Sequence, residues 1–443
     1  MVIFAEVMNC RVTIPENINC RVQLPPSKSI AVRAMFINAL AGNSPSVFEK
    51  ELAMSSISDI DVMAHALASE SDYINVRGAG TAMRFLTAFF AIQEGRTVVL
   101  DGDKRMRQRP IGVLVDTLRQ MGADINYLDC EGFPPLKITG RKLQGSDLHI
   151  DGSVSSQYIS ALLMIAPVVG GMKLTIEGDI VSRPYIDMTL ELMRHYGIEA
   201  CYNSPSKIEG VRGSMTSHNC DLKITVPEGQ YFVAPLAIEG DWSAASYWFA
   251  LKALLPESII MLLPLSKNSL QGDCAITEMM KPLGVNARFS EDSVVTLTST
   301  WTDEVGLVHT LPRYYERDMS DTPDLVPTLV ATLCLLHVPF RLTGLQSLRI
   351  KESDRVEALR VELAKFGYLV ECDHSTMRYD GNHSTPPPQV LIDPHGDHRI
   401  AMALSLAATL HPGITIKDAE VVQKSYPQWW QHLNNAQCSP KIC

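Results

Sequence analysis

Six apolar segments, each about as long as one helix and each preceded by polar residues, recur along this chain of 443 residues. Their mixture of Ala, Leu and other apolar residues is typical of helices that are buried on all sides. The segments begin at Ser27, Gly80, Ser155, Asp241, Asp321 and Asp397. Because these starts are separated by roughly 50 to 90 residues, they predict a fold built from repeated units.

The intervals between these segments contain a second, more amphipathic helix that ends at a glycine. The four clearest endings are LRQMGADINY, LMRHYGIEAC, MMKPLGVNAR and LAKFGYLVEC, which contain Gly122, Gly197, Gly284 and Gly367. Glycine stops a helix easily because it adopts the left-handed conformation without a steric penalty. Residues typical of β-strands follow each glycine, so the repeated unit is expected to be mixed α and β.

The composition limits the class of protein and its partners. With 46% hydrophobic residues, a chain of this length can form two or three domains with buried cores. The net charge of -10 argues against nucleic acid as the main partner. The uncharged stretch from Gly152 to Met172 contains only about ten apolar residues between its polar start and its Pro and Gly residues, which suits a buried helix and not a membrane span.

The cysteines and the N-terminus both indicate a cytoplasmic protein. The ten cysteines form no C-x-x-C pair and show no regular spacing, so neither a metal site nor a disulfide framework is predicted. A reducing compartment fits this usage best. The first residues, MVIFAEVMNC, lack the basic start and the cleavage site of a signal peptide.

Basic residues recur at the starts of the apolar segments. Lys28 and Arg33 belong to the first segment, Arg84 to the second and Arg399 to the sixth. Polar residues at a helix start can serve only as caps, but a cation is unfavourable beside the partial positive charge of a helix N-terminus. Repeated cations at such positions therefore indicate that bound anions neutralise them.

Two further basic motifs lie between the apolar segments. GDKRMRQRPI places Arg105, Arg107 and Arg109 just before Pro110, a favoured first residue of a helix, although a solvated basic loop would look the same. In RIKESDRVEAL, Lys351 and Arg355 are four residues apart and are predicted to share a helical face, with Glu352 beside them. A surface ladder of salt bridges is the alternative interpretation of that motif.

Taken in order, nine motifs resemble the 5-enolpyruvylshikimate-3-phosphate synthase (3-phosphoshikimate 1-carboxyvinyltransferase) family over almost the whole chain. They are PPSKSIAVRA (25–34), GAGTAMRFLTA (78–88), RMRQRPI (105–111), VSSQYISALLM (154–164), SRPYIDMTLELM (182–193), DTPDLVPT (321–328), RIKESDRVEAL (349–359), GDHRIAMALSLAA (396–408) and KSYP (424–427). The resemblance implies an α/β (α+β) fold of two similar domains, each built from three βαβαββ repeats, the inverse α/β barrel-like enolpyruvyl transferase fold. It places residues 1–24 with 242–443 in one domain and 25–241 in the other, with the active site in the interdomain cleft.

The activity that the resemblance implies is transfer of the enolpyruvyl group of phosphoenolpyruvate to the 5-hydroxyl of shikimate 3-phosphate, with release of phosphate. Bringing two phosphates and two carboxylates together requires several fixed cations, and Arg binds both groups in bidentate fashion. No cofactor or metal is expected. We expect a monomer whose partners are these two small molecules, with no nucleic acid and no membrane.

The resemblance also assigns roles to individual residues. Asp324 would be the base that activates the hydroxyl, and Glu352 with Lys28 would handle the proton added to and later removed from the methylene carbon. Phosphoenolpyruvate would be bound by Lys28, Gly80, Arg84, Arg109, Gln157, Arg355, Arg399 and Lys424. Shikimate 3-phosphate would be bound by Lys28, Ser29, Arg33, Ser155, Ser156, Gln157, Ser182, Tyr185, Asp324, Ser347 and Lys351.

The sequence departs from the family pattern at three positions, one of which is Phe85, where many relatives have Pro. Gly78 and Ser347 stand where the family usually has Asn, and Ser347 can still bond substrate directly or through water. Gly80 leaves space beside the expected phosphoenolpyruvate site, which predicts inhibition by glyphosate.

Two alternatives compete with this interpretation. One is the sister enolpyruvyl transferase acting on UDP-N-acetylglucosamine, although residues 101–110 lack the Cys usual in that family. The other is a non-catalytic anion-binding relative, which would gain nothing from Asp324 and Glu352 among its cations.

Overall fold

The computed structural model of the chain describes residues 8–43, 58–203, 221–299, 310–436 and 441–442. These residues form two compact units. Unit 1 contains the described residues up to Ser27 and from Glu239 onward, and unit 2 contains those from Lys28 to Ile238. Residues 1–7, which entered the prediction about a signal peptide, lie outside the described residues.

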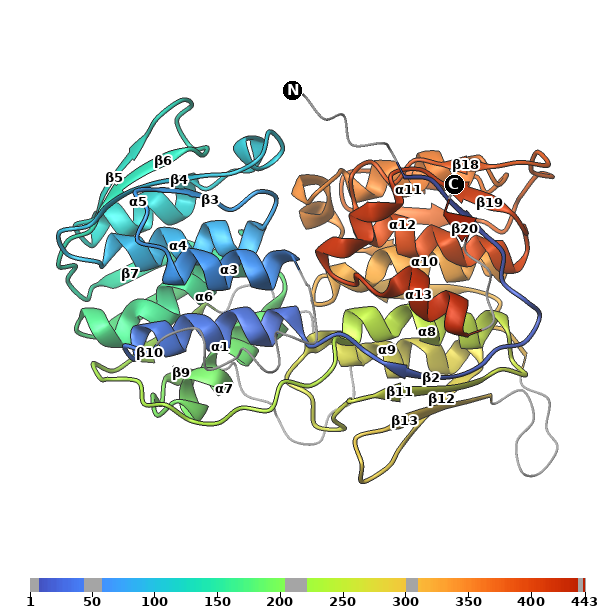
Figure 1. The fold of residues 1–443 in the computed structure, drawn as a ribbon, viewed down its shortest axis with the longest axis horizontal. Coiled ribbons are helices and arrows are strands. Elements are labelled where there is room, and N and C mark those ends of the chain that lie inside the picture. The colour runs from blue at the N-terminus through green and yellow to red at the C-terminus, as the bar shows by residue number, and fades with distance from the viewer. Residues whose placement is uncertain (1–7, 44–57, 204–220, 300–309, 437–440, 443) are drawn as a thin grey trace. The chain divides into compact units, whose positions relative to one another are not determined.

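Unit 2 alternates helices and short strands (Figure 1). Its α-helices are α1 (Lys28–Leu40), α3 (Ser58–Ala68), α4 (Gly80–Ala91), α5 (Gly112–Gln120), α6 (Ser156–Ile165) and α7 (Arg183–His195). Its 3-10 helices are η2 (Met106–Gln108) and η3 (Ala166–Val169). Its strands are β3 (Tyr73–Asn75), β4 (Thr97–Asp101), β5 (Asp124–Tyr127), β6 (Leu136–Thr139), β7 (Asp147–Asp151), β8 (Met172–Glu177), β9 (Cys201–Asn203) and β10 (Leu222–Val226).

Unit 1 repeats the same alternation and includes two strands from the start of the chain. Its α-helices are α8 (Trp242–Leu254), α9 (Ile276–Met280), α10 (Val326–Leu335), α11 (Arg355–Ala364), α12 (His398–Ser405) and α13 (Trp429–Asn435). Its 3-10 helices are η4 (Gly272–Ala275), η5 (Lys281–Leu283), η6 (Pro323–Leu325), η7 (Gln346–Ile350), η8 (Leu406–Thr409) and η9 (Ala419–Lys424). Its strands are β1 (Cys10–Val12), β2 (Asn19–Gln23), β11 (Ile259–Leu263), β12 (Val285–Phe289), β13 (Val295–Ser299), β14 (Tyr315–Asp318), β15 (Phe340–Thr343), β16 (Glu371–Cys372), β17 (Met377–Tyr379), β18 (Leu391–Ile392), β19 (Ile414–Ile416) and β20 (Lys441–Ile442).

The described strands form five four-stranded sheets with one shared topology. Their orders are β3-β4-β6-β5, β7-β8-β10-β9, β12-β13-β11-β2, β14-β15-β17-β16 and β18-β19-β1-β20. In each sheet one pair is parallel and the other two pairs are antiparallel; in the first, Tyr73 on β3 lies opposite Val99 on β4 in parallel register. A parallel pair needs a crossover connection, and helices such as α4 supply it. The mixed α/β repeats predicted from the sequence are therefore confirmed, apart from the repeat around α1, which extends into residues 44–57 outside the described part.

The predicted apolar segments form the central helices of the two units. All ten residues of α10 and all eight of α12 are buried, as is every residue of α8 except Leu254. In unit 2, every residue of α4 except Thr81 and every residue of α6 except Gln157 is buried, and α1 is buried from Ile30 to Asn38. These helices lack a solvent face because sheets and neighbouring helices cover them, as Figure 1 shows for the sheet of β3, β4, β5 and β6 along α4 and α5.

The four predicted glycine endings are also confirmed. Gly122, Gly197, Gly284 and Gly367 all have positive φ, between 84° and 100°. Strands β5, β9, β12 and β16 begin within a few residues of them. A side chain at these positions would be strained, which explains why glycine marks the same point in each repeat.

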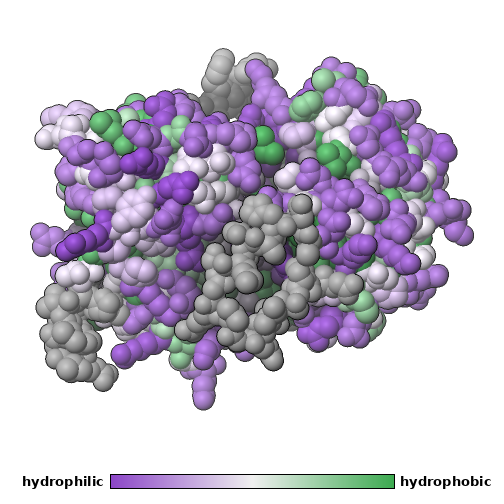
Figure 2. All heavy atoms as spheres, turned by 180° about the vertical axis from the view of Figure 1, so that it is seen from behind, coloured by the Kyte–Doolittle hydropathy of each residue, from purple (hydrophilic) through white to green (hydrophobic). Residues whose placement is uncertain are grey.

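Hydrophilic residues predominate on the molecular face shown in Figure 2, and hydrophobic residues occur there singly. Large exposed apolar side chains occur in separate parts of the chain, for example Tyr73 on β3, Leu128 just after β5 and Leu369 between α11 and β16. Within the described part of the chain, every helix is too short or too polar to cross a bilayer.

Candidate active site

Arg355 in unit 1 connects three carboxylates. It is the first residue of α11, and its side chain is 1% exposed. Its Nη1 lies 2.9 Å from Asp324 Oδ1, its Nη2 lies 3.1 Å from Glu352 Oε2 and its Nε lies 2.7 Å from Asp397 Oδ2. All three nitrogens of the guanidinium therefore donate to carboxylates that come from different segments of the chain.

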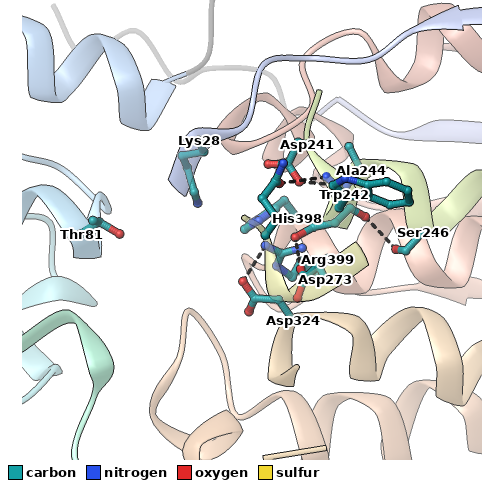
Figure 3. Close-up of polar contacts among 12 residues, drawn as sticks. Lys28, Thr81, Asp241, Trp242, Ala244, Ser246, Asp273, Asp324, His398 and Arg399 are labelled. Carbon is teal, nitrogen blue, oxygen red and sulfur yellow. Dashed lines mark hydrogen bonds and ion pairs between the residues drawn. The ribbon is translucent and has the colours of Figure 1, made fainter. Parts of the chain in front are cut away.

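Arg399 completes this network from the other side of Asp324 (Figure 3). Its Nη2 donates to Asp324 Oδ2 over 2.7 Å, so each oxygen of Asp324 accepts a hydrogen bond from a different arginine. The Asp324 side chain is 19% exposed, whereas both arginines are almost fully buried. Asp324 is thus more accessible to a reactant than either of the two arginines.

Lys424 extends the network through Glu352. Its Nζ lies 2.9 Å from Glu352 Oε1, while Glu352 Oε2 bonds to Arg355. Both oxygens of Glu352 are thereby paired with cations, and its side chain is 13% exposed. The structure brings together the sequence-predicted residues Asp324, Glu352, Arg355, Arg399 and Lys424 in this way.

The electrostatics of the cluster keep both buried arginines charged. Burial by itself lowers the pKa of Arg355, but Asp397, Glu352 and Asp324 outweigh it and raise that pKa above the usual range. For Arg399, burial likewise lowers the pKa, and Asp324, Tyr247 and Asp273 together raise it well above normal. Two guanidiniums that stay charged although they are buried can bind an anionic ligand.

Local capping explains why these side chains lie where they do. Asp397 is the N-cap of α12 and accepts a hydrogen bond from the backbone N–H of Arg399, which directs the first turn of α12 toward Asp324. Asp354 caps α11 in the same manner by accepting from the N–H of Glu357. Helix α11 therefore begins at Arg355, and Lys351 precedes it in extended conformation.

Two details of the sequence predictions about helix starts are wrong. Lys351 and Arg355 do not share a helical face, because the cap at Asp354 starts the helix after Lys351. Pro110 is not the first residue of a helix either, since Ile111 is the N-cap of α5 and Gly112 its first residue. In both cases the hydrogen bonds of the folded backbone, and not the residue pattern, decide where the helix begins.

In unit 2, Lys28 begins α1 and pairs with a buried carboxylate on α3. Lys28 Nζ lies 3.1 Å from Asp59 Oδ2, and their side chains are 15% and 6% exposed. Asp59 was not among the predicted site residues, because it is separated from Lys28 by 31 positions and lies outside the quoted motifs. This pair holds the ammonium at the N-terminus of α1.

The start of α4 brings Gly80 and Arg109 into contact. A Cβ atom on Gly80 would lie only 2.7 Å from Arg109 Nη1, so the guanidinium lies directly against the bare backbone. Arg109 is 8% exposed, and its Nε has no hydrogen-bond partner among the described residues. A buried cation with an unused donor beside a helix N-terminus is a good site for an anion.

Arg84 connects α4 to the segment that carries Arg109. Its Nη2 donates to the carbonyl of Pro110 over 2.9 Å, and its Nη1 donates to the carbonyl of Gly80 over 3.2 Å. The nearby Arg107 instead pairs with Asp101, with Nη2 2.6 Å from Oδ2. Of the basic motif before Pro110, Arg109 is therefore the residue that faces the start of α4.

Gln157, the second residue of α6, lies against the start of α4. Its Nε2 donates to Thr81 Oγ1 over 3.1 Å, and these are the two residues of α6 and α4 that are not buried. Ser155 is the N-cap of α6 and accepts from the N–H of Gln157. Lys28, Gly80 and Gln157 thus lie at the N-terminal ends of helices, and the guanidinium of Arg109 reaches the start of α4 from the segment before α5.

Arg33 has a different environment from the other predicted cations. It is 2% exposed, and its three nitrogens donate to Thr189 Oγ1, the carbonyl of Ser29 and Ser160 Oγ. Its guanidinium also lies 5.7 Å from the centroid of the Tyr185 ring, and burial lowers the pKa of Arg33 to about 10. These contacts join α1, α6 and α7, so Arg33 organises the helices around the predicted substrate residues.

The remaining predicted residues occupy loops and helix ends. Ser182 precedes α7 with a φ of 59° and is buried, and Ser156 is the first residue of α6. Ser347 lies in η7, where its Oγ has no hydrogen-bond partner among the described residues. Lys351 follows η7 and is half-buried.

Comparisons with known proteins identify the family of this chain. The family model of EPSP synthase (3-phosphoshikimate 1-carboxyvinyltransferase) matches residues 64–433. A 3-phosphoshikimate 1-carboxyvinyltransferase of Bacteroides fragilis (strain YCH46) is 41% identical over 98% of this chain and 99% of its own length. One of Shewanella halifaxensis is 32% identical, over 92% of this chain and 94% of its own length.

Solved structures support the fold. An EPSP synthase from Acinetobacter baumannii superposes with a TM-score of 0.67 at 19% identity, covering 98% of this chain and all of that one. The enolpyruvyl transferase NikO from Streptomyces tendae gives a TM-score of 0.69 at 14% identity, covering 98% of this chain and 99% of that one. The predicted enolpyruvyl transferase fold is therefore confirmed, and the chain belongs to the EPSP synthase (3-phosphoshikimate 1-carboxyvinyltransferase) family.

Proposed function

We propose that this chain transfers the enolpyruvyl group of phosphoenolpyruvate to the 5-hydroxyl of shikimate 3-phosphate and releases phosphate. The observation that carries the proposal is Asp324, a partly exposed carboxylate held between the buried guanidiniums of Arg355 and Arg399. Such a site offers a base and two fixed cations in one place, in a chain 41% identical to a relative named 3-phosphoshikimate 1-carboxyvinyltransferase. This reaction would serve the shikimate pathway, which leads to chorismate and the aromatic amino acids.

Asp324 would accept the proton of the attacking 5-hydroxyl. The oxygen of that hydroxyl then bonds to C2 of phosphoenolpyruvate, while the methylene carbon of phosphoenolpyruvate gains a proton. Each oxygen of Asp324 keeps a lone pair beside the one used by an arginine, so the carboxylate can still accept from substrate. The two arginines also fix its orientation, which favours proton transfer.

Glu352 and Lys28 would move the proton on the methylene carbon. That proton must be added before the new C–O bond is complete and removed again when the bond from C2 to phosphate oxygen breaks. Glu352 is held by Arg355 and Lys424, and Lys28 is held by Asp59. We assign the proton transfer to the pair and not to one member.

We assign phosphoenolpyruvate to the arginines and lysines of the candidate site and to the residues at the starts of α4 and α6. This set comprises Lys28, Gly80, Arg84, Arg109, Gln157, Arg355, Arg399 and Lys424, of which Arg84 acts by holding the segment of Arg109. Shikimate 3-phosphate is assigned to Lys28, Ser29, Arg33, Ser155, Ser156, Gln157, Ser182, Tyr185, Asp324, Ser347 and Lys351. Arg33 would reach it only after releasing part of its present hydrogen bonds.

Both alternatives are less well supported. The relatives at 41% and 32% identity carry the shikimate name, which does not favour UDP-N-acetylglucosamine as acceptor. A receptor for anions would bind them more weakly with Asp324 and Glu352 among its cations, because each carboxylate neutralises one arginine or lysine.

The deciding experiment is phosphate release by the purified chain. We expect release only when phosphoenolpyruvate and shikimate 3-phosphate are both present, and none when UDP-N-acetylglucosamine replaces the latter. A folded protein that gives no release with the first pair would contradict the proposed function. Release with UDP-N-acetylglucosamine alone as acceptor would favour the sister reaction.

The assigned residues come from both units, so we further propose that substrate is bound by both together in a cytoplasmic monomer. The physical reason is that the two phosphates and two carboxylates of the substrates repel one another, and the cations assigned to them are divided between the units. Unit 1 contributes Arg355, Arg399 and Lys424, and unit 2 contributes Lys28 and Arg109.

A further inference from the structure

Asp273 is a buried carboxyl group of unit 1 that has no role in the reaction as described so far. It lies in η4 and is 3% exposed. The preceding Gln271 fastens η4 to the start of α8, since its Oε1 accepts from the N–H of Trp242 and its Nε2 donates to the carbonyl of Gly240, at 3.0 and 2.9 Å. The position of Asp273 relative to α8 is therefore well defined.

The two carboxyl oxygens of Asp273 differ in their contacts. Oδ2 accepts a hydrogen bond from Ser243 Oγ in the first turn of α8. Oδ1 is shielded from solvent and has no hydrogen-bond partner among the residues that the structure describes. A charged carboxylate with one oxygen in this state costs free energy, whereas a neutral carboxylic acid costs much less.

The charged groups around Asp273 come from three elements. They are Arg399 of α12, Asp324 of η6 and Asp241 at the start of α8, and Figure 3 shows Asp273 in their company. Burial and the charge of Asp324 raise the pKa of Asp273 to about 7, against the opposing effects of Arg399 and Ser243. Burial also raises the pKa of the neighbouring Cys274 to about 11, so that thiol stays neutral at physiological pH.

The other carboxylates near Asp273 in sequence or space already have hydrogen-bond or ion-pair partners. On the adjacent helix α9, Glu278 is exposed and pairs with Lys281 at 2.6 Å. Glu239, which precedes α8, accepts from Gln271 and Ser269. Neither can replace Asp273 as a carboxyl beside Arg399.

Arg399 is the link between Asp273 and the reaction. Its guanidinium is already hydrogen-bonded to Asp324, and in the proposed function it must also hold a substrate anion. If Asp273 were ionised as well, a second carboxylate would offset the charge of Arg399 and weaken its attraction for that anion. If Asp273 is neutral, Arg399 keeps its charge for the ligand.

We propose that Asp273 is a positioning residue for the transferase, neutral while phosphoenolpyruvate is bound at Arg399, and that its ionisation weakens the binding of phosphoenolpyruvate. This proposal rests on the proposed function. By linkage, the bound anion would in turn favour the neutral form of Asp273.

The test compares the wild-type chain with Asp273→Asn, which has nearly the same shape, cannot ionise and can still accept from Ser243. We expect the wild-type KM for phosphoenolpyruvate to rise about fivefold or more from pH 6.5 to 8.5, because a linked proton is lost in that range. The KM of Asp273→Asn should stay flat, and kcat should change less than KM. Glu278→Gln, which removes an exposed carboxylate five residues away, should follow the wild-type profile.

A second variant and a second readout keep the test decisive. Ser243→Ala removes a donor that favours the charged form, so the rise in KM should move to higher pH. Between pH 4 and 7 the folded wild type holds a proton on Asp273 that the unfolded chain has lost, so its thermal stability should fall relative to Asp273→Asn as pH rises.

Parallel KM profiles or parallel stability profiles for wild type and Asp273→Asn would overturn the proposal. If Asp273→Asn cannot be purified, an unshifted profile for Ser243→Ala would overturn it. Absence of phosphate release from the wild type would instead contradict the proposed function, and the stability comparison would still test the titration of Asp273.

Discussion

Single residues in this protein take their chemical character from the charges beside them. Asp324 is an ordinary aspartate in sequence, yet it lies between two arginines that are almost completely buried. Glu352 is held in the same way by Arg355 and Lys424. At these positions a change of one side chain alters both a candidate proton acceptor and the cations that bind anions.

Asp324→Asn should lower kcat at least about a hundredfold, because Asn keeps the shape of the side chain but cannot accept a proton. The measurement is steady-state phosphate release, with circular dichroism and a melting curve to verify folding. Asp380→Asn, in an exposed turn of the same unit, is the matched control and should keep wild-type kinetics. Near-normal turnover of folded Asp324→Asn would remove Asp324 from the mechanism.

Lys28→Ala should also reduce turnover by about a hundredfold or more. It removes the ammonium at the start of α1 and leaves Asp59 as a carboxylate that is 6% exposed. Because an unpaired buried carboxylate is unfavourable, Lys28→Ala combined with Asp59→Asn should recover thermal stability but not activity. Recovery of activity in the double variant would show that Lys28 acts only as a structural partner of Asp59.

Gly80→Ala should raise the KM for phosphoenolpyruvate about tenfold, because the new Cβ displaces the guanidinium of Arg109, 2.7 Å away. Arg109 is a flexible side chain, so stability should change little. Gly112→Ala is a suitable control, since Gly112 also begins a helix but a Cβ there meets its nearest atom at 3.4 Å.

We also expect glyphosate to inhibit the wild type when the concentration of phosphoenolpyruvate is low. Unchanged activity at millimolar glyphosate would contradict this expectation.

Among the secondary-structure elements, helices α11 and α12 of unit 1 have cap residues at their N-termini that contribute both to the stability of the fold and to the position of the candidate active-site arginines. Asp397 caps α12 and also accepts from Arg355, whereas Asp354 caps α11 and pairs with Arg349 nearer the surface. The two caps look alike in sequence but differ in burial, because the Asp397 side chain is fully buried and that of Asp354 is 38% exposed.

Asp397→Ala should destabilise unit 1 by about 3 to 5 kcal/mol, because it removes a cap and a partner of a buried arginine together. Asp354→Ala should cost only about 1 kcal/mol, the usual effect of losing an exposed cap. Denaturant unfolding followed by fluorescence compares the two variants. Equal losses for both would mean that the pair of Asp397 with Arg355 adds nothing to stability.

For the whole molecule, the two compact units and their separate sets of cations lead to a prediction about shape in solution. If the anionic substrate is bound by residues of both units, adding shikimate 3-phosphate should lower the radius of gyration measured by small-angle scattering. The forward scattering should correspond to the monomer mass of 48.9 kDa with and without ligand. An unchanged radius of gyration at saturating ligand would contradict binding by both units.

The sequence alone predicted much of the fold, because the signals of its repeats are local. Helices such as α10 are apolar on every side, and glycines such as Gly122 mark a backbone conformation that other residues avoid. It predicted less of where helices begin, as Lys351 and Pro110 show. The cap after Lys351 forms only because the Asp354 side chain and the N–H of Glu357 meet in the folded chain, whereas α5 after Pro110 begins without a side-chain cap.

For the cations at the helix starts, the sequence by itself determined their number, their identity and the family to which their motifs belong. Only the tertiary structure decided their partners: Asp59 for Lys28, 31 residues away, and Asp397 for Arg355, 42 residues away. It also decided that Arg33 is bonded within unit 2 and that Asp273 lies near Arg399, as Figure 3 shows. The reason is that a helix is selected by neighbouring residues, whereas an ion pair depends on distant segments and on the burial that removes water from it.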